Sequence, residues 1–128
     1  MWAFLHKMAS PRYFYKIASS LVPWFLTSGL LLMVIGLING LFYAPPDYQQ
    51  GDAFRIIYVH VPAAYISMMA YSLMAFAAFV ALIWRIKIAH AVIVGAAPLG
   101  AWFTFLALLT GSIWGRPMWG TWWERGDP

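Results

Sequence analysis

The chain has 128 residues, of which 63% are hydrophobic and only 9% are charged, and its net charge is +4. Soluble domains carry roughly a quarter of charged residues, so this composition indicates an integral membrane protein and gives no sign of a nucleic-acid partner. The chain contains no cysteine, which excludes disulfides, thiolate metal sites and cofactors attached through cysteine.

Three long uncharged runs cover residues 17–46, 56–84 and 88–115. Each is longer than the roughly 20 residues that an α-helix needs to cross a bilayer. We therefore predict an all-α integral membrane fold with three transmembrane helices and an outer-face tryptophan-rich segment. Proline suits a first helical position and also stops a helix. On this basis the expected helix limits are about 23–43, 62–84 and 89–113.

The distribution of basic residues predicts the orientation of the helices. Cytoplasmic loops of membrane proteins carry an excess of Lys and Arg. We therefore expect the N-terminus and the 85–88 turn on the cytoplasmic side. The 44–61 loop and the C-terminal tryptophans would then share the outer side. The basic residues used here are Lys7, Arg12, Lys16, Arg85 and Lys87.

His60 is the first unusual residue on the expected outer side. It lies two residues before Pro62, and proline disfavours the α conformation in the residue that precedes it. We therefore expect His60 at the junction between the loop and the second helix. It is either a histidine satisfied at the membrane interface or a ligand, because ionisable residues near a bilayer are candidates for function.

Four of the eight tryptophans fall close together near the C-terminus: Trp114, Trp119, Trp122 and Trp123. An aromatic belt at the membrane surface explains one or two tryptophans at each helix end. If the segment "MWGTWW" forms a helical turn, its three tryptophans share one face and form a flat apolar platform. The residues alone leave belt and platform open.

Taken together, these side chains match the requirements of haem. A haem needs an aromatic surface for its faces, a neutral imidazole for its iron and arginines for its propionates. The four tryptophans would form the platform, His60 would be the axial ligand, and Arg55 and Arg116 are candidate propionate contacts. Quinones and lipids also bind aromatic surfaces. A divalent metal site formed by His60, Asp47 and Asp52 lacks any ligand spacing.

Two segments, "YAPPDYQQGDAFRIIYVHVPAAY" and "GSIWGRPMWGTWW", closely resemble the haem exporter protein C family of bacterial cytochrome c maturation. The resemblance runs from residue 1 to about Trp123. It implies a role in haem binding and delivery rather than catalysis, with non-covalent haem b as the transported ligand. It implies a multi-pass protein of the bacterial inner membrane. The implied partners are a periplasmic haem chaperone, a small single-helix membrane subunit and ATP-binding-cassette transporter subunits.

The chain departs from this family in two ways. The family has six transmembrane helices, and its second axial histidine lies in the half that this chain lacks. Residues 124–128 form a divergent tail after a membrane domain of residues 1–123, so a truncated, frameshifted or split gene is a hypothesis. His6 and His90 both lie on the expected inner side, which leaves His60 as the expected sole axial ligand. The alternative function is a structural or quinone-binding membrane subunit of a respiratory complex.

Overall fold

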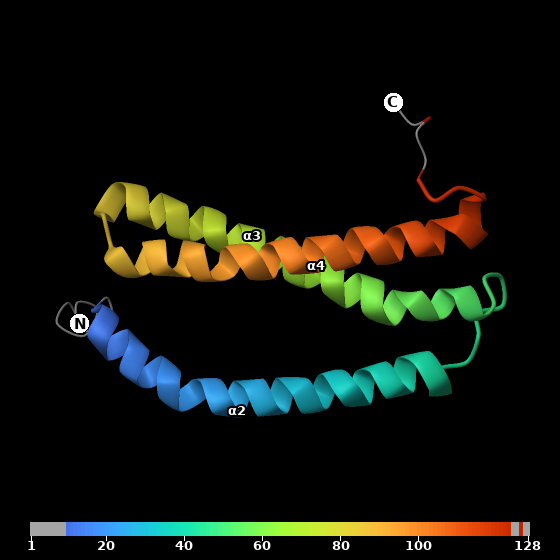
Figure 1. Cartoon of the computed structure of the whole chain (residues 1–128), viewed down its shortest axis with the longest axis horizontal. Helices are drawn as coiled ribbons and strands as arrows, with labels where there is room; N and C mark the ends of the chain where they lie inside the picture. Colours follow the sequence, from blue (N-terminus) through green and yellow to red (C-terminus); the bar gives the residue numbers. More distant parts are fainter. Residues whose placement is uncertain (1–9, 124–125, 127–128) are drawn as a thin grey trace.

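Three long helices dominate the computed structural model, which describes residues 10–123 and residue 126 (Figure 1). They are α2 (Pro11–Ile38), α3 (Ile57–Trp84) and α4 (Lys87–Trp119). Together with the short turns that adjoin them, they give three helical segments long and apolar enough to cross a membrane. The predicted all-α fold with three transmembrane helices is confirmed.

Two helices begin earlier than we predicted. α2 begins at Pro11, which takes the first helical position that we had assigned to Pro23. α3 begins at Ile57, after a 3-10 turn at Asp52–Ile56. Pro23 and Pro62 therefore lie inside helices. An internal proline leaves a single carbonyl without its amide partner, whereas ending a helix within a bilayer would expose several backbone groups.

The helix ends agree with the prediction for the first two helices and differ for the third. α2 passes into a π-helical turn at Asn39–Tyr43, and α3 ends at Trp84. α4 continues beyond the expected limit near residue 113 and ends at Trp119. Gly120 follows with a left-handed φ of 75°, a conformation that terminates many helices.

α3 and α4 form an antiparallel hairpin around a two-residue turn, and small side chains fill the interface between them. Small residues let two helix backbones approach closely, which favours packing within a bilayer. Ser67 Oγ lies 2.6 Å from Thr104 Oγ1, and Thr104 donates its own proton to the Gly100 carbonyl at 2.8 Å. Ser67 is therefore the donor between the helices. The buried side chains of the hairpin are Ala63, Ser67, Ala77, Ala81 and Ala89.

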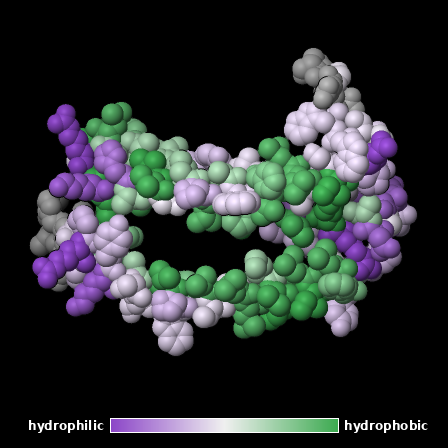
Figure 2. All heavy atoms as spheres, in the orientation of Figure 1, coloured by the Kyte–Doolittle hydropathy of each residue, from purple (hydrophilic) through white to green (hydrophobic). Residues whose placement is uncertain are grey.

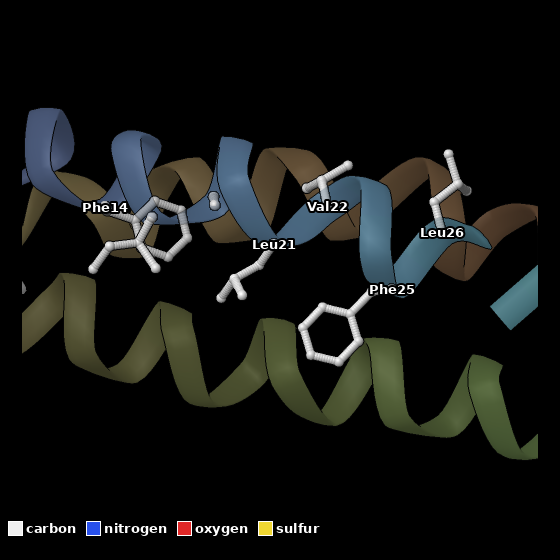
Figure 3. Close-up of a pocket in the computed structure, with 7 residues that line it drawn as sticks. Phe14, Leu21, Val22, Phe25 and Leu26 are labelled. Carbon is white, nitrogen blue, oxygen red and sulfur yellow. The ribbon is translucent and has the colours of Figure 1, made fainter. Parts of the chain in front are cut away.

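α2 lies beside the hairpin but packs little against it. None of its residues is buried, and Figure 2 shows an open space between α2 and the hairpin. A pocket of about 560 Å³ runs along the first half of this helix (Figure 3). The residues that line it all belong to α2: Phe14, Ile17, Ala18, Leu21, Val22, Phe25 and Leu26.

The loop that follows α2 is fastened to the hairpin at one end of the molecule. Gly40 is buried against Tyr58, because a Cβ atom at Gly40 would lie 2.6 Å from that ring. Arg55 Nη1 donates a hydrogen bond to the Leu41 carbonyl at 2.6 Å. The start of α2 and the α3–α4 turn lie at the opposite end (Figure 1). The 44–56 loop and the C-terminal tryptophans therefore share one end, which we call the loop end.

Candidate functional site at the loop end

His60 lies within the first turns of α3, and not at the junction of loop and helix that we expected. The half-buried imidazole faces α4, where its Nδ1 atom lies 3.0 Å from Thr110 Oγ1. The adjacent Gly111 allows this close approach, because a Cβ atom there would lie 3.1 Å from His60 Cε1. The ring of Trp114 contacts the imidazole edge-on, with 5.8 Å between the ring centroids.

A pocket of about 220 Å³ brings His60 together with the tryptophan-rich segment. Its lining includes the imidazole of His60, small residues along one side of α4, and three tryptophan rings that come from the end of α4 and the chain beyond it. The small residues are Ala107, Gly111, Ser112 and Gly115, and the tryptophans are Trp119, Trp122 and Trp123. The pocket thus combines a nitrogen ligand with an aromatic wall.

The three tryptophans meet through a reversal of the chain, and not through the helical turn that we considered. α4 ends at Trp119, and the left-handed Gly120 turns the chain away from the helix axis. Thr121 Oγ1 then donates to the Trp123 carbonyl at 3.0 Å, which holds the turn. Gly115 leaves room for the Trp119 ring, since a Cβ atom at Gly115 would lie 3.1 Å from it.

Trp114 has a different position from the other three tryptophans. It does not line the pocket with His60 but a neighbouring cavity of about 330 Å³. Its Nε1 atom donates a hydrogen bond to Gln50 Oε1 at 3.1 Å. Trp114 therefore supports the imidazole of His60 and joins α4 to the loop, whereas the pocket's aromatic wall comes from the later tryptophans.

The two candidate arginines are also placed differently. Arg116 is exposed beside the pocket, where its guanidinium carbon lies 5.8 Å from the Trp122 ring centroid and its Nη1 atom donates to the Gly120 carbonyl. Arg55 lies within the loop. Its Nε atom is 3.0 Å from an Asp52 carboxylate oxygen, although the N–H is not aligned for a hydrogen bond. Arg116 is thus the arginine closer to the aromatic wall.

The carboxylates of the loop serve the loop itself. Asp47 Oδ1 accepts the backbone N–H groups of Gln49 and Gln50, both at 2.9 Å, and Asp52 pairs with Arg55. Over residues 10–123 and 126, no group of three or more His, Asp and Glu side chains could hold a metal ion. The alternative of a divalent metal site gains no support from this arrangement.

The remaining histidines do not approach His60 in the part of the chain that the structure describes. His90 lies in the first turns of α4, at the end opposite the site, and His6 lies outside the described residues. The 24 residues from His90 to Trp114 correspond to roughly 36 Å of helix at 1.5 Å per residue.

Sequence reasoning missed three residues of the site: Gln50, Thr110 and Gly111. The tight turn at Arg85 and Ile86 carried a signal for two of them, because residues equidistant from such a turn face each other in an antiparallel hairpin. His60 and Thr110 are equidistant from it. Nothing in the sequence indicated the contact of Gln50 with Trp114.

Membrane-spanning helices with an imidazole and an aromatic pocket at one end define an integral membrane protein with a candidate ligand site near the bilayer surface. The family model described as "Heme exporter protein C" matches residues 4–126. The chain belongs to the heme exporter protein C family, which confirms the resemblance seen in the two sequence segments.

Curated relatives agree with this assignment. The chain is 54% identical to Heme exporter protein C of Haemophilus influenzae over 123 residues, which cover 96% of this chain and 50% of that protein. It is 50% identical to the protein of the same name from Escherichia coli K12, with the same coverage. For the Bradyrhizobium diazoefficiens protein the identity is 46% over 117 residues, or 91% of this chain and 44% of that protein. The chain spans about half the length of the curated relatives it matches.

Proposed function

We propose that this chain binds haem non-covalently at the loop-end pocket and takes part in delivering it for the maturation of c-type cytochromes. The observation that carries this proposal is a single pocket lined by the imidazole of His60 and by three tryptophan rings. Membership of the heme exporter protein C family supports haem as the ligand. The role is one of handling a ligand, without a chemical step.

The residues of the pocket suit the parts of a haem, which would be the transported substrate. A neutral imidazole is a common ligand for haem iron, and His60 supplies one. Trp119, Trp122 and Trp123 offer flat faces on which a porphyrin can stack. Arg116 lies beside Trp122 and would pair with a propionate, because guanidinium and carboxylate form strong charge-assisted hydrogen bonds.

The pocket is suited to passing a ligand on rather than enclosing it. Its volume of about 220 Å³ is below the roughly 300–1,000 Å³ of pockets that enclose a drug-sized ligand. Trp119, Trp122 and Trp123 are 69%, 58% and 59% exposed. A haem would therefore lie across the aromatic wall with much of its surface uncovered, where a second protein can reach it.

We further propose that the loop end faces the periplasm, with the N-terminus in the cytoplasm of a bacterium. Support comes from the five basic residues used above for the orientation, because Lys and Arg favour the cytoplasmic side. A periplasmic haem chaperone would receive the haem. A small single-helix subunit and ATP-binding-cassette subunits are the proposed membrane partners.

The test is the haem content of the chain purified in detergent from haem-replete cells. We expect a Soret band in the wild type that is lost in His60→Ala. The double variant Trp119→Ala/Trp122→Ala should retain less haem than the wild type. The matched control is Trp24→Ala/Trp84→Ala, which removes two exposed tryptophans far from the pocket and should leave haem content unchanged.

Two outcomes would contradict this proposal. One is a wild-type chain that inserts normally but carries no haem and binds none when it is added. The other is haem content that persists without His60 and without Trp119 and Trp122. That second result would indicate that the tryptophans act as an aromatic belt at the membrane surface.

A further inference from the structure

Thr110 lies between His60 and the backbone of its own helix. Its Oγ1 atom is 3.0 Å from His60 Nδ1, and it is 2.6 Å from the carbonyl oxygen of Leu106. The Ala107 carbonyl is farther from this hydroxyl, at 3.3 Å. The hydroxyl thus has two close polar neighbours, a ring nitrogen and a carbonyl oxygen.

The positions of these atoms decide where the protons lie. A carbonyl oxygen only accepts hydrogen bonds, and a hydroxyl has a single proton to donate. Two oxygens 2.6 Å apart repel each other unless a proton lies between them, so the Thr110 hydroxyl donates to Leu106. The hydroxyl can then only accept from the imidazole. The Nδ1 atom of His60 must therefore carry a proton.

We propose that Thr110 is a positioning residue that holds neutral His60 in the Nδ1–H tautomer, which leaves the lone pair on Nε2 for a ligand. In a neutral imidazole one nitrogen donates and the other accepts, and the bond made by the first selects the second as the ligand atom. Over residues 10–123, we find no hydrogen bond to His60 Nε2. The inference that Nε2 binds iron rests on the proposed function, whereas the tautomer rests on the geometry alone.

The neighbours of His60 keep the ring in this orientation. Gly111 leaves space for the Cε1 edge, with only 3.1 Å from that atom to the place where a Cβ atom would lie. The Trp114 ring meets the imidazole at an interplanar angle of 60°. A ring that flipped to place Nε2 against Thr110 would have to rotate between these two contacts. Thr110 therefore fixes both the proton and the direction of the ring.

Nuclear magnetic resonance of histidine labelled with ¹⁵N and ¹³C tests the tautomer in the haem-free chain. The His60 signals are assigned as those missing from His60→Gln. We expect the Nδ1–H tautomer in the wild type and in Thr110→Ser, which keeps a hydroxyl. In Thr110→Val we expect the Nε2–H tautomer to become populated. The control Thr104→Val removes the equivalent hydroxyl contact to Ser67 and should leave His60 unchanged.

An Nε2–H tautomer in the wild-type chain would overturn the inference, and this result needs no variant to fold. The same conclusion follows if Thr110→Val folds and retains the wild-type tautomer, because Thr110 would then only join the two helices.

Haem binding gives an independent second measurement. Losing an outer hydrogen-bond partner of a metal ligand typically costs about 10–100-fold in affinity. We expect Thr110→Val to weaken haem binding within this range and to raise the midpoint reduction potential, since its imidazole donates less strongly to iron. Thr110→Ser should restore both values. Equal affinity and equal potential in Thr110→Val would contradict the positioning role. A wild-type chain that shows the Nδ1–H tautomer but never binds haem would instead contradict the proposed function.

Discussion

Trp114 donates a hydrogen bond from its indole Nε1 to the side-chain oxygen of Gln50, at 3.1 Å, and this bond joins the end of α4 to the loop after α2. The same indole ring contacts His60. One side chain therefore connects the loop, α4 and the histidine of α3. A change in the loop can reach the imidazole through this single residue.

Removing the amide of Gln50 should loosen the loop. A net hydrogen bond contributes about 0.5–1.5 kcal/mol, so Gln50→Ala should raise local opening of residues 44–51 by roughly 2- to 13-fold. Hydrogen exchange of the loop amides measures this change. Gln49→Ala is the matched control, because among the described residues only the backbone of Gln49 makes a hydrogen bond. Equal exchange in the two variants would show that the bond to Trp114 does not hold the loop.

Filling the space at Gly111 should disturb His60 directly. A Cβ atom there would lie 3.1 Å from His60 Cε1, so in Gly111→Ala the ring must move by a few tenths of an ångström. We expect weaker haem binding with normal membrane insertion, measured by haem titration. Gly95→Ala is the control on the same helix, because a Cβ atom at Gly95 would meet nothing within 4 Å. If both variants bind haem as the wild type does, the imidazole is not held as the structure indicates.

The chain reversal at Gly120 should also be sensitive to substitution. Gly120 has a φ of 75°, and a residue with a Cβ atom in this left-handed region costs roughly 1–2 kcal/mol. Gly120→Val should misplace Trp122 and Trp123 and reduce haem retention. Gly120→Asn should be milder, because asparagine adopts this conformation more readily. The haem content of the two purified variants checks this order, and a reversed order would exclude backbone strain as the cause.

Reporter fusions test the orientation of the helices. Fusions after Pro46 and after Trp123 should show periplasmic activity, and a fusion after Lys87 should show cytoplasmic activity. The physical reason is the excess of basic residues at the N-terminus and at the α3–α4 turn. A cytoplasmic signal from the fusion after Pro46 would place His60 on the wrong side for delivery to a periplasmic chaperone.

The described residues offer one histidine at the loop end, so the bound haem should take a single axial ligand from them. Added imidazole should then shift the spectrum toward a form with two nitrogen ligands. His90→Ala should leave the spectrum unchanged, since His90 lies at the far end of α4. A low-spin spectrum with two histidine ligands that disappears in His90→Ala would contradict both the site and the helix arrangement.

The three helices could be predicted because a bilayer admits few alternatives to a long apolar helix, and the structure has three such segments. Their starting points could not be predicted as well. Pro11, Pro23 and Pro62 all suit a first helical position by local preference, yet only Pro11 occupies one. The continuous apolar run on both sides of Pro23 makes an unbroken helix more favourable than an early end.

The sequence identified the side chains of the pocket but not the way in which they meet. His60, Trp119, Trp122 and Trp123 were all expected at a site and line one pocket. The chain reversal depends on the left-handed backbone of Gly120, which no periodic pattern reveals. The contact of His60 with Thr110 depends on the register of the hairpin, which is set by packing of small residues and by the turn at Arg85.

The loose packing of α2 has a mechanical consequence for the protein. The pocket is built by residues of α3, α4 and the segment after α4, and α2 contributes none of them. α2 itself has no buried residue and is fastened through the loop at one end. Lateral pressure in the bilayer, or a neighbouring helix pressed against α2, can therefore tilt this helix like a door on its hinge. The pocket stands on the other side of that hinge and keeps its shape while the door swings.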